Sequence, residues 1–180
     1  SSALCCSCTC LSDDIEFISR IYHKSRISST MQPLHGDLWV RRMDALDVVA
    51  VHAMSNHLEK LALSKWPTEI YHGVLKSDLY WAWVVVDGRN ELKAFCIFKK
   101  IGNGIVDAIR VVSVPNNLTV GKKLMFWCLD FFRNEGYRKI VGRCVFEHKA
   151  YYESIGVKVI GRRPHLFGVG VDGYEVEYLV

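Results

Sequence analysis

The stretch Val112-Ser113-Val114-Pro115-Asn116-Asn117-Leu118-Thr119-Val120-Gly121-Lys122-Lys123-Leu124 joins a β-branched segment to a helical one. The β-branched run stops at Pro115, which has no backbone N–H for a sheet ladder. Beyond it, apolar residues recur with helical spacing up to Asn134, and Gly136 follows as a helix stop. We therefore predict a strand over Ile105–Val114 and a helix over Val120–Asn134.

Two strands are predicted before this joint. Tyr80–Val86 is aromatic and β-branched, and Glu91–Lys100 follows it after the turn Asp87-Gly88-Arg89-Asn90. Gly102-Asn103-Gly104 provides the next turn. Short turns join antiparallel neighbours, so these segments and Ile105–Val114 should form an antiparallel meander.

After the joint, Lys139–Val145 reads as a strand that must pair in parallel with Ile105–Val114, through a right-handed helical crossover. A short helix is predicted over His148–Ile155, with Gly156 as its stop. Val157–Arg163 and Tyr174–Val180 are the last two predicted strands. A mixed sheet splays where its strands diverge, and α/β ligands bind at such switch points.

The N-terminal part combines one strand with two helices. Leu38–Arg42 is a short strand, Asp44 is a plausible N-cap for a helix to about Leu63, and a second helix runs from about Trp66 to Lys76. Residues 1–36 are rich in Ser and Cys and contain one short candidate helix, Asp13–Tyr22. We expect residues 1–36 to be an arm and residues 37–180 to be one domain.

Composition limits the function classes. The 180 residues are 50% hydrophobic and 23% charged, with net charge +4, which suits one globular domain with a core. Lys and Arg are scattered, so a nucleic-acid partner is not expected. No apolar run is long enough for a membrane span, and the first residues predict no secretory signal, because they lack a basic head and an apolar stretch. We expect a cytoplasmic protein without a membrane partner.

Four of the seven cysteines, Cys5, Cys6, Cys8 and Cys10, lie close together. Such a cluster could bind a soft metal or crosslink chains. Its spacing matches no standard zinc module, however, and no second pair follows. The other three cysteines lie singly in apolar segments, where a thiol usually fills core space. We therefore predict no metal site.

The order of elements resembles the GNAT superfamily of N-acetyltransferases. In that family a Val-x-Val-Pro-like strand end precedes a loop of pattern Gln/Arg-x-x-Gly-x-Gly/Ala and a long helix. The resemblance implies an α/β (α+β mixed) fold: a mixed, mostly antiparallel sheet with helices on both faces and a central βαβ unit. It also implies that loop and helix N–H groups face the pyrophosphate of acetyl-CoA. The implied cofactor-binding residues are Val112, Val114, Asn116, Thr119, Val120, Gly121, Lys122 and Lys123.

The loop departs from this pattern. Asn116 stands where Gln or Arg is expected, and Thr119 stands where the first Gly is expected. The Cβ of Thr119 restricts close approach of a pyrophosphate, and Lys122 and Lys123 are cations that partly compensate. The alternative interpretation of the stretch is a plain strand–turn–helix joint.

A second stretch, Val145–Val157, resembles the late GNAT motif that ends in Tyr-x-x-x-Gly-Phe. Tyr152 takes the tyrosine position and Gly156 the glycine, while Val157 replaces Phe. The resemblance implies that Tyr152 protonates the departing CoA thiolate. The alternative is that Tyr152 and its neighbour Tyr151 only pack in the core.

A general base is harder to assign. Asp107 begins the central strand, and Glu147 and His148 flank the short helix, so these three are our candidates. The alternative for each is an ordinary surface charge, and a base acting through water is common in the family. Glu69 and Tyr71 on the second helix are weaker candidates for substrate contact.

Two functions of different classes follow. The first is acetyl transfer from acetyl-CoA to a primary amine of a small molecule or protein, by direct attack in a ternary complex. The second is a GNAT-like scaffold without catalysis. The late stretch, with His148 before an aromatic pair and Ser-Ile-Gly-Val, also resembles GNAT-like internal virion proteins of short-tailed phages. That resemblance implies a virion component whose N-terminal arm contacts other copies or neighbouring proteins.

Overall fold

The computed structural model describes residues 31–55, 66–114 and 118–180. Contacts between Cα atoms divide the chain into two units, Ser1–Met31 and Gln32–Val180. The second unit contains the whole of the described sheet and its helices. The predicted helix Asp13–Tyr22 and the N-terminal cysteine cluster lie outside the described residues.

An eight-stranded sheet runs through this unit in the order β1-β2-β3-β4-β5-β6-β8-β7. Neighbouring strands pair antiparallel except β5 and β6, which pair in parallel. The predicted meander and parallel crossover are therefore confirmed. The strands are β1 (Gln32–His35), β2 (Leu38–Arg42), β3 (Tyr80–Val86), β4 (Leu92–Gly102), β5 (Ile105–Ser113), β6 (Lys139–Val145), β7 (Lys158–Arg163) and β8 (Gly173–Leu179).

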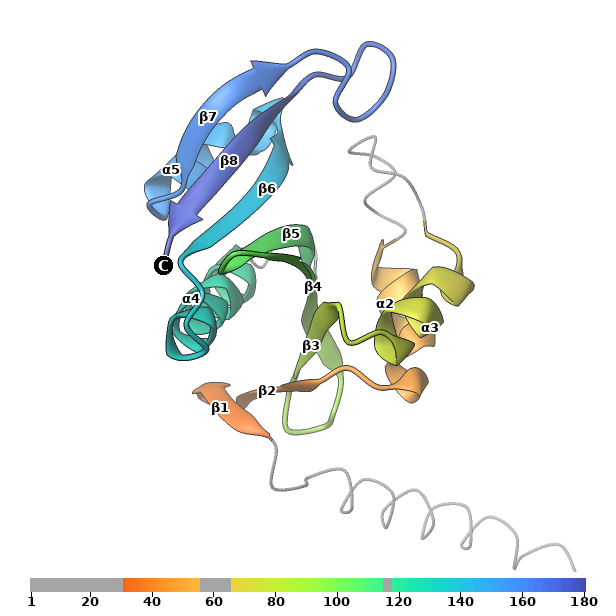
Figure 1. Ribbon diagram of the computed structural model, residues 1–180. Helices are drawn as coiled ribbons and strands as arrows, with labels where there is room; N and C mark the ends of the chain where they lie inside the picture. The colour runs from red at the N-terminus through yellow and green to blue at the C-terminus, as the bar shows by residue number, and fades with distance from the viewer. Residues whose placement is uncertain (1–30, 56–65, 115–117) are drawn as a thin grey trace, which may run out of the picture. The chain divides into compact units, whose positions relative to one another are not determined.

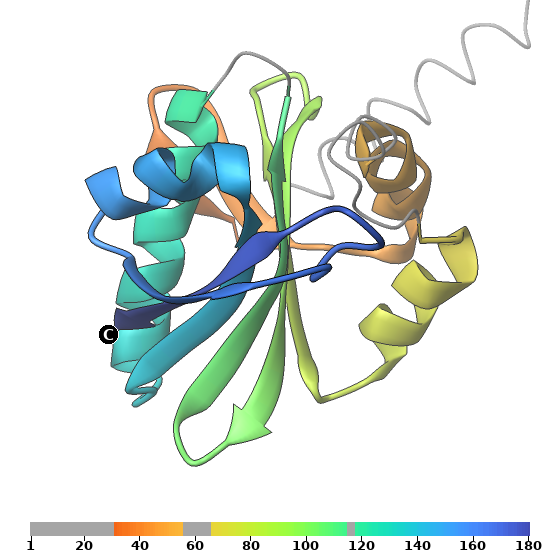
Figure 2. The ribbon, with the colours of Figure 1, turned by 90° about the horizontal axis from the view of Figure 1, so that it is seen from above.

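Helices cover both faces of the sheet, as the GNAT-like fold class requires. Helices α2 and α3 lie on one face, and α4 and α5 lie on the other (Figure 2). Helix α4 connects β5 to β6 and completes the central βαβ unit (Figure 1). The helical segments are η1 (Ala45–Asp47), α2 (Val48–Ser55), α3 (Thr68–Lys76), α4 (Leu118–Asn134), η3 (Phe146–His148) and α5 (Lys149–Ser154).

The larger core lies between the sheet and α4. Leu124, Cys128 and Phe132 recur every fourth residue on one side of α4, and each is fully buried. They pack against sheet residues that include Trp83 and Phe98. This amphipathic spacing is the pattern that predicted the helix.

Helix α4 ends as the sequence indicates. Gly136 has a positive φ of 78°, which suits glycine because it has no Cβ. The Tyr137 N–H donates to the Phe132 carbonyl at 2.9 Å, and the Gly136 N–H donates to the Arg133 carbonyl at 3.1 Å. These two bonds form a Schellman motif, which satisfies carbonyls that the helix end would otherwise leave without donors.

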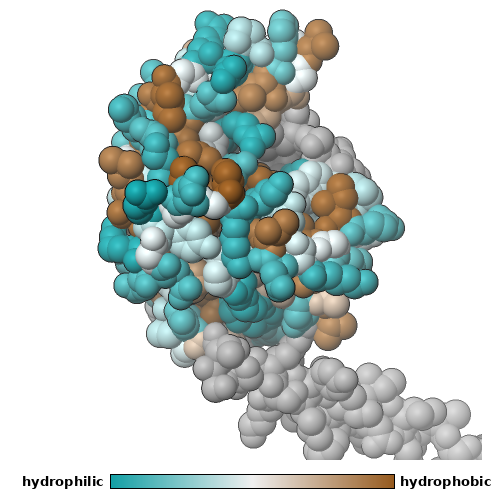
Figure 3. Space-filling view, viewed as in Figure 1, coloured by the Kyte–Doolittle hydropathy of each residue, from teal (hydrophilic) through white to brown (hydrophobic). Residues whose placement is uncertain are grey.

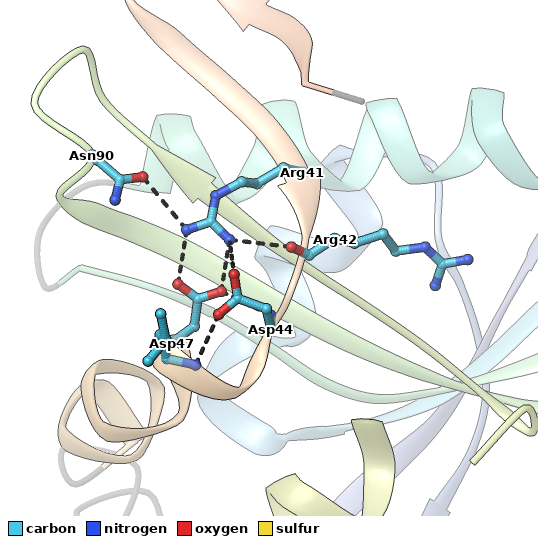
Figure 4. Close-up of polar contacts among 6 residues, drawn as sticks. Arg41, Arg42, Asp44, Asp47 and Asn90 are labelled. Carbon is cyan, nitrogen blue, oxygen red and sulfur yellow. Dashed lines mark hydrogen bonds and ion pairs between the residues drawn. The ribbon is translucent and has the colours of Figure 1, made fainter. Parts of the chain in front are cut away.

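A buried ion pair fixes the start of the first helical segment (Figure 4). The Arg41 guanidinium donates to both Asp47 carboxylate oxygens, at 2.7 and 2.8 Å. Asp47 also accepts the Asp44 backbone N–H, while the Asp44 side chain accepts the Leu46 N–H. The two acidic residues thus form a capping box. The prediction that Asp44 is an N-cap is confirmed.

The structure differs from the predicted elements at several ends. Strand β1 (Gln32–His35) is absent from the prediction and lies in the stretch assigned to the arm. The helix after Asp44 begins as a 3-10 turn and is described to Ser55, so its predicted end at about Leu63 lies outside the described residues. Helix α4 begins two residues earlier than predicted, at Leu118.

On the face shown in Figure 3, apolar side chains form patches among predominantly hydrophilic ones. The exposed large apolar residues include Val169 in the β7–β8 connection and Leu179 on the last strand. None of the described helices combines the length and apolar character needed to cross a membrane.

Candidate functional site

Strands β5 and β6 separate halfway along their length. They pair in parallel from Ile105 and Lys139 to Ala108 and Gly142, and no pair follows. On the other side, β5 continues to pair with β4 as far as Ser113. The β4–β5 register shifts between Ala108 and Arg110, and such a bulge bends the strand that carries it. The bulge therefore turns the end of β5 away from β6.

Alternation along β5 decides which side chain faces which helices. Val112 pairs with Phe95, and the Phe95 ring lies 6.4 Å from that of Tyr71 on α3. Val111 packs in the core beneath α4 instead. Arg110 and Val112 thus face α2 and α3, whereas Val111 and Ser113 face α4.

A cleft of about 380 Å³ occupies the space between the separated strand ends. The cleft reaches both faces of the sheet. His148 and Leu166 also line it. On the side of α4 and α5 it is lined by Val111, Met125, Ile140, Cys144, Tyr152, Val157, Val176 and Tyr178. On the opposite side it is lined by Trp66, Arg110, Val112, Arg143, Phe167 and Glu177.

The backbone of β5 has an open edge along this cleft. The Val114 N–H donates to the Lys93 carbonyl at 2.9 Å and is therefore used in pairing with β4. Successive strand residues direct their backbone groups to opposite edges, so the Ser113 N–H faces the edge that β6 leaves. Of the implied cofactor-binding residues, Val112 lies on β5 and Val114 directly follows it, but alternation makes Ser113 the residue whose N–H faces the cleft.

The first turn of α4 lies directly against the end of β5. Val120 and Gly121 are buried, and a Cβ placed on Gly121 would lie 3.3 Å from Ser113 Oγ. A side chain at Gly121 would thus crowd this contact. Thr119 and Lys122 are exposed, and Lys123 is half-buried. Asn116 lies outside the described residues.

Tyr152 lies on α5 and lines the cleft. Its carbonyl accepts the Val157 N–H at 3.1 Å, and Gly156, with a φ of 85°, donates to the Glu153 carbonyl. The Tyr-x-x-x-Gly spacing is therefore a second Schellman motif. Burial raises the pKa of the Tyr152 phenol well above its usual range, and the Cys144 thiol adds to the shift. The phenol stays protonated at neutral pH.

The three candidate bases have different environments. His148 lines the cleft. Glu147 is exposed, and Asp107 is buried in the paired part of β5, opposite Val141; neither of these two lines the cleft. One Asp107 oxygen accepts from the Arg143 guanidinium at 2.6 Å. Arg143 lines the cleft itself, so the direct contribution of Asp107 is to hold Arg143.

The two weaker candidates on α3 differ in exposure. Glu69 is exposed. Tyr71 is fully buried, and its hydroxyl lies 2.8 Å from Ser55 Oγ. The prediction of substrate contact by Tyr71 is wrong, because its ring fills the core between α3 and the sheet and its hydroxyl is bonded there.

Several cleft residues have no signal in the local sequence. The Arg110 guanidinium carbon lies 4.2 Å from the centre of the Trp66 ring, and these residues are far apart in the chain. The Phe167 ring lies over Gly173, where a Cβ would be only 2.5 Å from a ring carbon. A glycine such as Gly173 can indicate in the sequence that another group packs closely against the backbone. The sequence does not show that this group is the Phe167 ring.

No side-chain cluster of a metal-binding kind, with three or more His, Cys, Asp or Glu residues, occurs in residues 31–55, 66–114 and 118–180. The chemistry that the described cleft can support rests on its backbone edge, its helix N-terminus and its few polar side chains.

No family model matches the chain, and no curated protein sequence matches it. Several solved structures, however, are similar to the chain. The spermidine N-acetyltransferase of Vibrio cholerae in complex with CoA and spermine has a TM-score of 0.68 at 17% identity, over 81% of this chain and 96% of that one. The ribosomal-protein-S18-alanine N-acetyltransferase of Escherichia coli gives 0.68 at 13% identity, over 79% and 94%.

Ard1 from Thermoplasma volcanium is similar over 81% of this chain and 99% of its own, with a TM-score of 0.69 and 11% identity. At such identities the similarity concerns the path of the backbone. With its mixed sheet, its βαβ unit and strands that separate at β5 and β6, this chain has the GNAT fold.

Proposed function

We propose that the protein is an acetyl-CoA-dependent N-acetyltransferase that acetylates a primary amine by direct attack in a ternary complex. The observation that carries this proposal is the cleft between β5 and β6, which reaches both faces of the sheet. One opening can admit the thioester and the other the amine, so that the two reactants meet between the strands. The similar structure solved with CoA and spermine supports the assignment.

The α4 side of the cleft suits the cofactor. The positive end of the α4 dipole lies at this first turn, which contains Gly121, and it favours a bound anion. We assign the pyrophosphate to the segment Asn116–Lys123, with Lys122 and Lys123 as supporting cations. The pantetheine arm would follow the open edge of β5 near Val112 and Val114.

The chemistry requires few protein groups. The amine nitrogen bonds to the thioester carbonyl carbon, the carbon–sulfur bond breaks, and the CoA sulfur takes a proton while the amine loses one. We assign to Tyr152, which lines the cleft, the donation of the proton to sulfur, and to the Ser113 N–H the stabilisation of charge on the carbonyl oxygen. His148 is the candidate base that lines the cleft, whereas Asp107 acts as a positioning residue for Arg143.

Two measurements test the proposal. Isothermal titration of the full chain with acetyl-CoA should show binding, which the alternative of a non-catalytic scaffold does not require. Tyr152→Phe should lower kcat by about 100-fold or more, as loss of a general acid does, with little change in acetyl-CoA affinity.

The matched control is Tyr151→Phe, because Tyr151 packs against Tyr152 with ring centroids 5.4 Å apart but does not line the cleft. Its kcat should stay within about 3-fold of wild type, because a hydroxyl away from the reacting atoms stabilises no transition state. Equal activity of both variants and wild type would exclude Tyr152 as the acid. Absence of acetyl-CoA binding would exclude the enzymatic function.

A further inference from the structure

The side of the cleft that faces α2 and α3 carries two aromatic rings from opposite walls. Trp66 lies beside Arg110 on the β5 wall, and Phe167 lies beside the end of β6. With acetyl-CoA on the α4 side, as proposed above, this is the side from which the acceptor amine enters. Its lining therefore determines which amines fit.

The Trp66 ring is held firmly. The Arg110 guanidinium lies over it at 4.2 Å, and the Tyr71 ring centre lies 5.5 Å from its own. Tyr71 is itself fully buried and bonded to Ser55. A half-exposed ring fixed in this way can contact an apolar group in the cleft without losing side-chain entropy on binding.

Phe167 is held from the other wall. Its ring occupies the space beside Gly173 where any side chain would clash, at 2.5 Å from an added Cβ. Asp172 ties the surrounding loop together by accepting from Arg162 and from the His165 N–H. The Phe167 N–H donates to the Val171 carbonyl at 3.2 Å. The ring position is thus built into the β7–β8 connection.

The carboxylates on this face of the sheet already have cationic partners. Asp107 accepts from Arg143 at 2.6 Å, and Glu177 accepts from Lys139 at 2.8 Å. The lining of the cleft contains one carboxylate among the described residues, Glu177, and it is already paired with Lys139. A polycationic acceptor, which needs several anionic partners, is therefore disfavoured here relative to an amine with one charge.

We propose that the acceptor is a primary amine on a flat apolar body, of the arylalkylamine class, rather than a polyamine. The aryl group lies against Trp66 and Phe167, and the amine points into the cleft toward the thioester. This inference rests on the proposed acetyltransferase function. The reaction transfers the acetyl group to nitrogen and releases CoA as the thiol, so thiol release reports turnover.

The test uses the full chain with acetyl-CoA and three amines: phenylethylamine, spermidine and ethylamine. The kcat/KM for phenylethylamine should exceed that for spermidine by at least about 10-fold. Phe167→Ala should lower kcat/KM for phenylethylamine about 10-fold or more, while ethylamine, which is too short to reach the ring, changes less than about 3-fold. Val169→Ala on the same loop is the control, because Val169 is 96% exposed.

Phe167→Leu provides a second variant that keeps an apolar side chain if Phe167→Ala does not fold. It should retain ethylamine turnover and lose the preference for the aryl amine. Preference for spermidine, or equal losses for phenylethylamine and ethylamine, would overturn the inference while leaving the acetyltransferase function intact. Failure of acetyl-CoA to bind at all would overturn both.

Discussion

His148 and Glu147 are adjacent residues with different environments, and the difference can be measured. His148 lines the cleft and Glu147 is exposed outside it. If His148 is the base that accepts the amine proton, His148→Ala should lower kcat/KM about 100-fold, the usual contribution of a general base. The matched control Glu147→Ala should change it less than about 3-fold, as expected for a surface residue outside the cleft. Steady-state kinetics at saturating acetyl-CoA would show this, and equal effects of the two substitutions would exclude His148 as the base.

Cys144 gives the site a pH-dependent contribution to stability. Burial raises the pKa of its thiol from 9.0 to about 11, with Glu153 adding to the shift. Below the unfolded pKa both states keep the proton, so stability does not change with pH. As the pH rises from 9 to 11, the unfolded state loses its proton first, and the folded state is destabilised by about 2 kcal/mol.

Replacing Cys144 by Ala removes this titration. Urea unfolding at several pH values should give a difference between wild type and Cys144→Ala that shrinks by about 2 kcal/mol between pH 8.5 and 11. The cavity left by the substitution adds a constant at every pH, so only the change with pH reports the thiol. If the free energies of unfolding of wild type and Cys144→Ala differed by the same amount at every pH, the Cys144 thiol would not titrate in this range.

At the scale of elements, two Schellman motifs end helices with glycine, and they make a matched pair. Gly136 and Gly156 both have positive φ, at 78° and 85°. A Cβ at Gly136 would meet nothing within 4 Å, whereas one at Gly156 would lie 3.3 Å from the Tyr178 ring. Gly136→Ala should therefore lower the free energy of unfolding by about 1 kcal/mol through the backbone alone.

Gly156→Ala should cost about 1 kcal/mol more than Gly136→Ala, because its Cβ must also displace the Tyr178 ring. It should also lower kcat, since Gly156 ends the helix that positions Tyr152, whereas Gly136→Ala should leave kcat unchanged. Denaturation and kinetics on both variants would show this. If both substitutions lowered the free energy of unfolding equally, the Tyr178 ring would move aside at no cost.

The same elements show what local sequence could predict and what it could not. Both glycine stops, the Asp44 cap and the helical spacing of α4 follow from neighbouring residues, so the order of elements from β2 onward was predictable. Strand β1 was not, because its pairing with β2 is a contact between segments rather than a pattern within Gln32–His35. The shift at Ile109 likewise depends on the register with β4.

The site divides in the same way. Tyr152 and Gly121 could be found because a fixed spacing marks each of them. Arg110 with Trp66, and Phe167 with Gly173, are contacts between residues distant in the chain or across a loop. The alternation of side chains along β5 could be predicted from the sequence. Which backbone edge of β5 stays unpaired could not, because it depends on where β6 stops pairing with β5, after Ala108 and Gly142. The side of the cleft that carries Trp66 and Phe167 was therefore not predictable from the sequence.

At the scale of the whole described unit, the sheet consists of two parts joined where β5 pairs with β6. The N-terminal part shares a large core with α4, centred on residues such as Trp83 and Phe132. The C-terminal part has a small core of four buried residues, Cys144, Ile155, Val157 and Val176. A part with few buried apolar contacts opens at lower free energy than the rest. Amides of β7, β8 and α5 should therefore exchange with solvent faster than those of β3 and β4.

Acetyl-CoA in the cleft would contact both parts, so it should slow the opening of the weaker one. At roughly 100 times its Kd a ligand stabilises the state it binds by about 2.7 kcal/mol, close to 100-fold in protection. Hydrogen exchange followed by mass spectrometry should show this slowing in peptides from β6, β8 and α5, with smaller change in β1 and β2 at the far edge. Protection confined to the α4 side would mean that the cofactor binds without bridging the cleft, and the amine and thioester would then not be held together between the strands.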